Sequence, residues 1–148
     1  MVISFDLSEI EFIDYLKRHL IQRCYMTDQL RYLRWALIIS GLAFLLVWPL
    51  MHFWPSGWQW TPAHHEYEQM IIGIYATLGI FLILAARNPL ENLSLIWFTI
   101  WSNLVHGTIM LFQALSDPTE LPHIYGDIPA LYLIALLLAF LVPKASRG

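Results

Sequence analysis

The chain is a succession of long apolar segments separated by short polar ones. Four stretches contain no Asp, Glu, Lys or Arg: residues 35–65, 69–86, 92–116 and 128–143. An α-helix rises about 1.5 Å per residue, so about 20 apolar residues cross the hydrocarbon core of a bilayer. The pattern predicts four transmembrane helices, at about residues 33–52, 69–86, 92–115 and 128–143.

The segment before these spans, residues 1–32, has a different pattern. Ser8 and Glu11 have the S-x-x-E spacing of a capping box, which is typical of a helix start. Apolar residues then recur at helical spacing, at Ile10, Ile13, Leu16, Leu20, Ile21 and Cys24. This predicts an amphipathic N-terminal helix that lies in the cytoplasm or at the membrane interface.

Capping residues and prolines mark where the later helices begin. Thr61-Pro62 and Asn88-Pro89 each place a capping side chain before a proline, and Asp127 precedes Pro129. The short connection at Asn88 predicts that the second and third spans form a tight hairpin. The fold class is an all-α membrane protein: an antiparallel four-transmembrane-helix bundle in which residues 1–148 form a single membrane domain.

Small residues recur along the second span. Gly73, Ala76 and Gly79 follow one another at intervals of three residues, and Pro49 lies near the outer end of the first span. Small side chains let a neighbouring helix approach closely in a membrane. We expect close helix packing at this side of the second span and a bend at Pro49.

Composition supports the membrane class. The chain is 58% hydrophobic and 13% charged, with a mean hydropathy of +0.57, which excludes an ordinary soluble domain. Cys24 is its single cysteine, so a disulfide framework or a thiolate metal site within one chain is excluded. The first apolar run is long enough to span, so we expect it to act as the targeting signal in place of a cleaved signal peptide.

The charges are divided between the two sides of the predicted bundle. The basic residues precede the first span, separate the second from the third, or follow the fourth: Lys17, Arg18, Arg23, Arg31, Arg34, Arg87, Lys144 and Arg147. The other two connections collect Glu66, Glu68, Asp117, Glu120 and Asp127. The positive-inside rule then predicts a multi-pass protein of the bacterial cytoplasmic (inner) membrane with both termini in the cytoplasm. No further basic cluster suggests nucleic-acid binding.

A polar stripe on the third span is the main functional candidate. Thr99, Asn103, His106, Met110 and Gln113 follow at steps of four, three, four and three, so they share one helix face. Unpaired polar groups are costly in hydrocarbon, so the stripe should face the bundle interior, a water-filled cleft or a second subunit. The stripe is either interhelical hydrogen-bond glue or a ligand or proton site around His106.

The sequence leaves open whether the protein binds a cofactor. A haem needs two axial ligands at similar depth, and His106 has no obvious second ligand in the chain unless two copies pair in a homodimer. A divalent metal has more candidate ligands near the outer surface: His64, His65, Glu68, His123 and Asp127. The chain has no nucleophile elbow, phosphate loop or HExxH motif, so no known hydrolytic signature is present.

One stretch of the chain resembles a known group. It comprises Ala86-Arg87-Asn88-Pro89-Leu90-Glu91, Ser94-Leu95-Ile96-Trp97-Phe98, Trp101-Ser102, His106, Met110, Gln113 and Gly126-Asp127-Ile128-Pro129-Ala130-Leu131. These motifs resemble a family of small uncharacterised bacterial four-helix integral membrane proteins, a domain of unknown function. The resemblance covers roughly the last eighty residues. It implies the four-helix membrane fold and no particular activity.

These observations favour a non-enzymatic binding or accessory subunit with an interior polar site on the third helix. Its partners would be the lipid bilayer and either further copies of itself or a larger membrane complex. One alternative is a membrane redox or lipophile-transforming enzyme that uses His106 on a quinone, haem or lipid. Another is a subunit of an oligomeric transporter.

Overall fold

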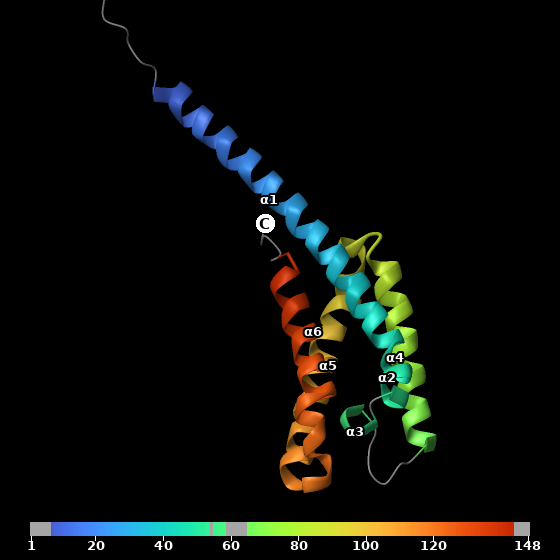
Figure 1. The fold of residues 1–148 in the computed structure, drawn as a ribbon. Helices are drawn as coiled ribbons and strands as arrows, with labels where there is room; N and C mark the ends of the chain where they lie inside the picture. Colours follow the sequence, from blue (N-terminus) through green and yellow to red (C-terminus); the bar gives the residue numbers. More distant parts are fainter. Residues whose placement is uncertain (1–6, 54, 59–64, 144–148) are drawn as a thin grey trace, which may run out of the picture.

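The computed structural model describes residues 7–53, 55–58 and 65–143; for residues 7–25, 56–57 and 65–68 it describes chiefly the backbone. Every regular element among them is a helix (Figure 1). The α-helices are α1 (Leu7–Leu45), α2 (Val47–Phe53), α3 (Pro55–Trp58), α4 (His65–Ala85), α5 (Leu93–Ser116) and α6 (Asp127–Leu141). Two 3-10 helices, η1 (Pro89–Asn92) and η2 (Pro118–Tyr125), precede α5 and α6. The all-helical class predicted from the sequence is confirmed.

The N-terminal helix and the first predicted span are one continuous helix. α1 runs from Leu7 to Leu45, and its N-terminal part extends beyond the other helices (Figure 1). No glycine or proline occurs before Gly41, so nothing in the sequence interrupts the backbone hydrogen bonds of this helix. The prediction of a separate helix over residues 1–32 is therefore corrected. Whether this part lies at a membrane interface stays a prediction.

The C-terminal end of the first predicted span is bent, as Pro49 predicts. The segments Met26–Leu45 and Val47–Phe53 meet at an angle of 47°. Proline lacks an N–H, and its ring collides with the carbonyl group four residues earlier, which here belongs to Leu45. The break between α1 and α2 falls at this position.

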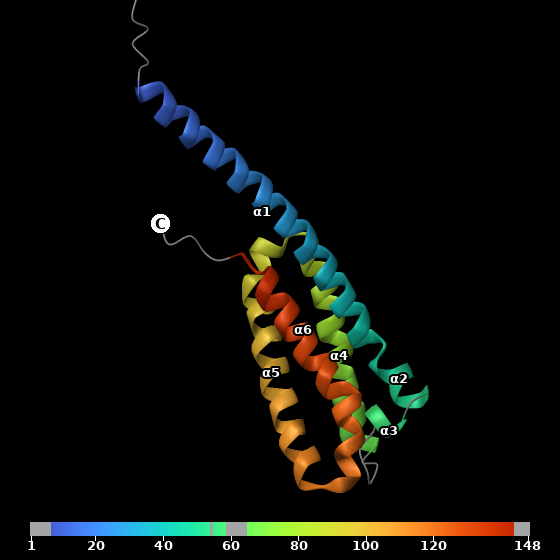
Figure 2. The same ribbon diagram turned by 60° about the vertical axis from the view of Figure 1, so that its left-hand side comes forward.

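The long helices form two packed pairs. α1 packs along α4, α5 packs along α6, and contacts between α1 and α6 join the pairs. Around the bundle the order is α4, α1, α6 and α5 (Figures 1 and 2). Although they are consecutive in the chain, α4 and α5 make no extensive contact among the described residues. The connection through η1 is short, as the hairpin prediction requires, but the two helices that it joins pack mainly against other partners.

The α1–α4 pair is closest where two glycines meet. A Cβ atom added to Gly41 would lie 2.6 Å from the carbonyl oxygen of Gly79, and one added to Gly79 would lie 2.6 Å from the carbonyl oxygen of Gly41. The predicted close approach at Gly79 is confirmed. Gly73 takes no part in it, because nothing lies within 4 Å of a Cβ at that position.

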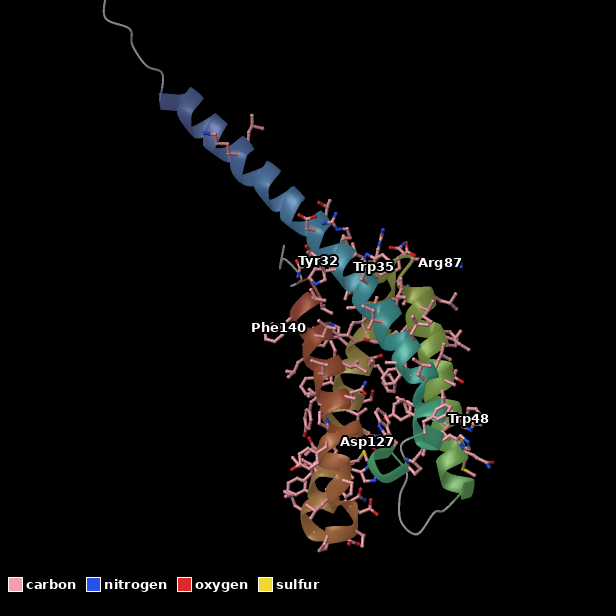
Figure 3. All side chains as sticks on the ribbon, viewed as in Figure 1. Tyr32, Trp35, Trp48, Arg87, Asp127 and Phe140 are labelled. Carbon is pink, nitrogen blue, oxygen red and sulfur yellow. The ribbon has the colours of Figure 1, made fainter. Side chains whose placement is uncertain are left out.

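The interior is apolar and the outside carries many large apolar side chains. Leu33, Leu37, Leu82, Ile96 and Leu138 are fully buried. Tyr32, Trp35, Trp48 and Phe140 lie on the outer surface, and Arg87 lies at the end of the bundle away from Asp127 (Figure 3). Exposed large apolar residues on all long helices are what a lipid environment would accommodate.

Length and hydropathy identify membrane-competent segments among the described residues. Pro89–Ser116, with 28 residues, is long and apolar enough to cross a bilayer by itself. Up to two more spans result if each bent pair counts as one: Met26–Leu45 with Val47–Phe53, and Pro118–Tyr125 with Asp127–Leu141. Gln69–Ala85 is an apolar helix but shorter. One to three helices can therefore span a membrane.

Two predicted helix caps differ from the structure. The Asn88 side chain makes no capping hydrogen bond, and η1 intervenes before α5 begins at Leu93. Asp127 is the first residue of α6 and its carboxylate is directed to His123 instead of to the helix N–H groups. The predicted cap at Thr61-Pro62 lies outside the described residues.

Candidate functional site

A pocket lies between the two helix pairs at the end of the bundle where α2 and α3 are found. Its lining comes from six α-helices: Ala43 and Phe44 of α1; Val47 and Met51 of α2; Trp58 of α3; Ile71 and Tyr75 of α4; His106 and Met110 of α5; and Asp127, Ala130, Leu131 and Ile134 of α6. Its volume is about 80 Å³. α3 contacts both α2 and η2 and so bridges the two sides near the end of the pocket (Figure 2).

A hydrogen bond between Tyr75 and His106 crosses this pocket. The Tyr75 hydroxyl lies 3.0 Å from Nδ1 of His106, and the two ring centroids are 5.7 Å apart. Phe44 also stacks on the Tyr75 ring, with ring centroids 5.0 Å apart. The bond therefore links α4 to α5 where their backbones do not pack against each other.

The stacked Phe44 ring limits how far Tyr75 can move. If the Tyr75 O–H donates to Nδ1, the ring hydrogen of a neutral His106 is on Nε2, which can then donate to another acceptor. The pair can thus present one N–H group among apolar side chains. That is a suitable arrangement for holding a carbonyl or similar oxygen of a bound molecule.

A second group of polar side chains, from η2 and the start of α6, reaches the pocket. Nδ1 of His123 lies 3.0 Å from each carboxylate oxygen of Asp127, and Nε2 lies 3.1 Å from Oε2 of Glu120. The His123 side chain is only 3% exposed, whereas Glu120 is 17% exposed. Figure 3 shows Asp127 near the start of α6, next to α3. A continuous series of carboxylate, imidazole and carboxylate groups therefore runs from the pocket wall to the outer surface.

The loop before this cluster is held by Asp117. Its Oδ1 accepts the backbone N–H of Thr119 at 2.9 Å and the Thr119 hydroxyl at 2.8 Å. These hydrogen bonds, the backbone one first, lower the pKa of the exposed Asp117 carboxyl below its ordinary value. Asp117 thereby caps η2, the helix that supplies Glu120 and His123.

The predicted polar stripe divides into buried and exposed parts. Thr99 and Asn103 are buried, and each side chain donates a hydrogen bond to a backbone carbonyl of its own helix. The Thr99 hydroxyl donates to the carbonyl of Leu95 at 2.8 Å, and the Asn103 amide donates to the carbonyl of Thr99 at 2.7 Å. Met110 is buried and lines the pocket, whereas the Gln113 side chain is exposed. Of the five stripe residues, only His106 and Met110 therefore line the pocket between the helix pairs.

His106 and Met110 also border a second hollow. A shallow groove of about 360 Å³ on α5 is lined by these two residues together with Ser102, Val105, Ile109 and Gln113. Gln113 thus belongs to the outer groove and Asn103 to neither hollow. His106 and Met110 are thus lining residues of both the groove and the pocket.

The candidate metal ligands are only partly within the described side chains. Among the described residues, no group of three or more His, Cys, Asp and Glu side chains is arranged to hold a metal ion. His64 and the side chains of His65 and Glu68 lie outside them. Of the five predicted ligands, His123 and Asp127 have described side chains, and these two side chains contact each other directly.

Tyr75 was not among the residues singled out from the sequence. It occupies one stripe with Ile71, Gly79 and Leu82 of α4 and with Ala86, the residue after its end, at steps of four, four, three and four. Gly79, Leu82 and Ala86 are buried, so this stripe faces inward. A phenol on an inward-facing stripe is a signal that could have identified Tyr75, whereas its distance from His106 could not be read from the chain.

The chain matches one known protein family. A model described as a family of unknown function, DUF6632, matches residues 27–147. The chain belongs to this family. The motifs between Ala86 and Leu131 lie within the DUF6632 match, which also includes α2, α3 and α4 and so extends well beyond the last eighty residues. No curated protein and no solved structure matches the chain significantly.

Proposed function

We propose that this DUF6632 protein is a membrane-embedded binding subunit for a small lipophilic molecule that carries a hydrogen-bonding oxygen. The observation that supports this proposal most is the Tyr75–His106 hydrogen bond, which is 3.0 Å long and lies in a pocket whose other walls are mainly aliphatic and aromatic. Ligand pockets are commonly apolar with a few converging polar groups that set orientation. Here the polar groups are the imidazole, the phenol and the Asp127 carboxylate.

The size of the pocket limits what it holds. About 80 Å³ is smaller than a cavity of roughly 150 Å³ that accepts benzene. The pocket therefore accepts a polar head or a narrow end, and the rest of the molecule lies in the groove along Val105 and Ile109. A lipid-like molecule with a carbonyl or hydroxyl head fits this division.

The protein itself crosses the membrane four times in this proposal. The first span is α1 together with α2, the second is α4, the third is α5, and the fourth is η2 together with α6. The short apolar part of α4 is accommodated by local thinning of the bilayer or by extension of the span through residues 65–68. Both termini and Arg87 are then cytoplasmic in the bacterial inner membrane, and the Glu120–His123–Asp127 end faces outward. The subunit self-associates or joins a larger complex through its exposed apolar faces.

Native mass spectrometry of the full-length protein released from a mild detergent tests the proposal. The wild type should retain a discrete non-protein mass, and the same spectrum gives the number of subunits. His106→Phe keeps a ring but removes both nitrogens, so the affinity for the retained molecule should fall by about tenfold, which is what the loss of a hydrogen bond of about 1.4 kcal/mol produces, and the occupancy should fall with it.

His52→Phe is the matched control. His52 is exposed on α2, stacks on Trp48 and does not line the pocket, so this variant should retain the ligand as the wild type does. A wild-type protein that carries no small molecule from its native membrane would contradict the proposal. Equal occupancy in wild type and His106→Phe would remove His106 from it.

A membrane enzyme is the second candidate. One observation favours it: His106 and Asp127, two groups that can carry protons, line the same apolar pocket. A retained molecule that is converted to a product of different mass on incubation, with conversion lost in Asp127→Asn while binding persists, would establish this function in place of simple binding.

A further inference from the structure

The group of three side chains at the outer end has a geometry that binding alone does not require. Asp127 lines the pocket, His123 contacts Asp127 with one ring nitrogen and Glu120 with the other, and Glu120 is partly exposed. Each contact, at 3.0–3.1 Å, is within the range over which a proton can be transferred directly.

We propose that Glu120, His123 and Asp127 form a proton relay that connects the pocket to the aqueous surface. This inference rests on the proposed function, because it assigns the bound molecule to a class that gains or loses a proton, such as a phenol, a hydroquinone or a weak acid. Tyr75 and His106 are the other titratable groups of the pocket lining, so the relay would deliver protons to them or to the ligand.

The transfer balances within the three residues. A proton taken from water by the Glu120 carboxylate passes to Nε2 of His123. The imidazole releases its Nδ1 proton to the Asp127 carboxylate, which then presents a carboxyl group to the pocket. Glu120 is again a carboxylate, and His123 is left with its hydrogen on Nε2. Transfer in the opposite direction, in which Nδ1 takes a proton from the Asp127 carboxyl group and Nε2 returns its own to the Glu120 carboxylate, restores the starting tautomer.

Burial supports this role. The His123 side chain is 3% exposed and lies between the carboxylates of Glu120 and Asp127, whose side chains are 17% and 14% exposed, so a proton that passes through this imidazole travels from one carboxylate to the other. A carboxylate whose only task was to begin α6 would be directed to the helix N–H groups. Asp127 makes no such capping bond and instead offers both oxygens to Nδ1 of His123.

The test measures how fast the His106 ring exchanges its proton with water. The full-length protein is labelled with ¹⁵N-histidine and held in nanodiscs, and the His106 signal is assigned with His106→Phe. We expect Glu120→Gln and His123→Gln each to slow exchange at His106 by about tenfold or more, a loss typical of removing a proton-transferring group. His52→Gln, an exposed histidine outside the pocket, should leave the rate unchanged.

Glu120→Gln is the decisive variant because glutamine can still hydrogen-bond to His123 but cannot pass a proton as a carboxyl group does. An unchanged exchange rate in Glu120→Gln would overturn the relay. The same samples are examined for retained ligand: retention with an unchanged rate refutes the relay alone, whereas absence of ligand from the wild type refutes the proposed function. A slowed rate supports the relay in either case.

Discussion

The Tyr75 hydroxyl and Nδ1 of His106 lie 3.0 Å apart and connect α4 to α5 across the bundle. Both helices pack mainly against other partners, α4 on α1 and α5 on α6. The two residues are 31 positions apart in the chain. This bond therefore couples the two helix pairs at the pocket, and its removal should affect both stability and binding.

A double-mutant cycle measures that coupling. Tyr75→Phe, His106→Phe and the double variant should give a coupling free energy of about 0.6 kcal/mol, rising to about 1.7 kcal/mol if the site is fully closed to water. Tyr132→Phe with Thr108→Val is the matched cycle for another phenol, since their hydroxyls lie 2.9 Å apart between α5 and α6. Denaturant-dependent unfolding in mixed micelles supplies the free energies. A coupling of zero for Tyr75 and His106 would mean that the bond contributes no stability.

The contact between Gly41 of α1 and Gly79 of α4 predicts that alanine at Gly79 and alanine at Gly73 have different effects on stability. Gly79→Ala places a Cβ 2.6 Å from the carbonyl oxygen of Gly41, so the helices must separate. We expect a destabilisation of about 1–3 kcal/mol from overpacking, reduced by the better helix propensity of alanine. Gly73→Ala meets nothing within 4 Å and should be neutral or stabilising by up to about 1 kcal/mol.

Thermal unfolding of the two alanine variants in parallel checks this contrast. Both replacements are in α4 and gain the same intrinsic helix propensity, so their difference isolates the contact with Gly41. Equal midpoints for Gly79→Ala and Gly73→Ala would show that α1 and α4 do not approach as closely as described.

Asn103 should contribute little to ligand binding. It is 1% exposed, its amide nitrogen donates to Thr99 of the same helix, and its Oδ1 accepts no hydrogen bond from the described residues. Burying an unpaired acceptor costs about 1–3 kcal/mol. Asn103→Leu, which has a similar volume and no polar atom, should raise stability by about 1 kcal/mol and leave ligand occupancy unchanged. Loss of the retained mass in this variant would return Asn103 to the binding site.

The proposed four-span topology predicts which ends of α5 can be labelled from outside. Cys24→Ser first removes the single native thiol. A cysteine is then introduced at Asn88 or at Thr119, which are both exposed and lie beyond opposite ends of α5. In intact cells with a permeable outer membrane, an impermeant maleimide should label Thr119→Cys. It should label Asn88→Cys only after the inner membrane is disrupted. The reverse result would invert the orientation given by the basic residues.

Much of the helix content could be predicted from the sequence, because hydropathy and helix-breaking residues act locally. The last three apolar stretches largely coincide with α4, α5 and α6. Pro49 predicts the bend between α1 and α2 because its ring acts on the preceding turn. The continuity of α1 was equally local: no glycine or proline separates residues 7 and 40, although the amphipathic pattern suggested a boundary.

The sequence by itself determined that the chain is helical, that its basic residues lie before the first apolar segment, between the second and third, and after the fourth, and that His106 lies on a polar face of the third apolar helix. Only the tertiary structure decided which helices pack together, because apolar faces pair non-specifically and the Gly41–Gly79 contact depends on two backbones meeting. It also decided that Tyr75 reaches His106 and that His123 lies between Glu120 and Asp127. Such contacts depend on side-chain direction in three dimensions, which spacing along one helix does not specify.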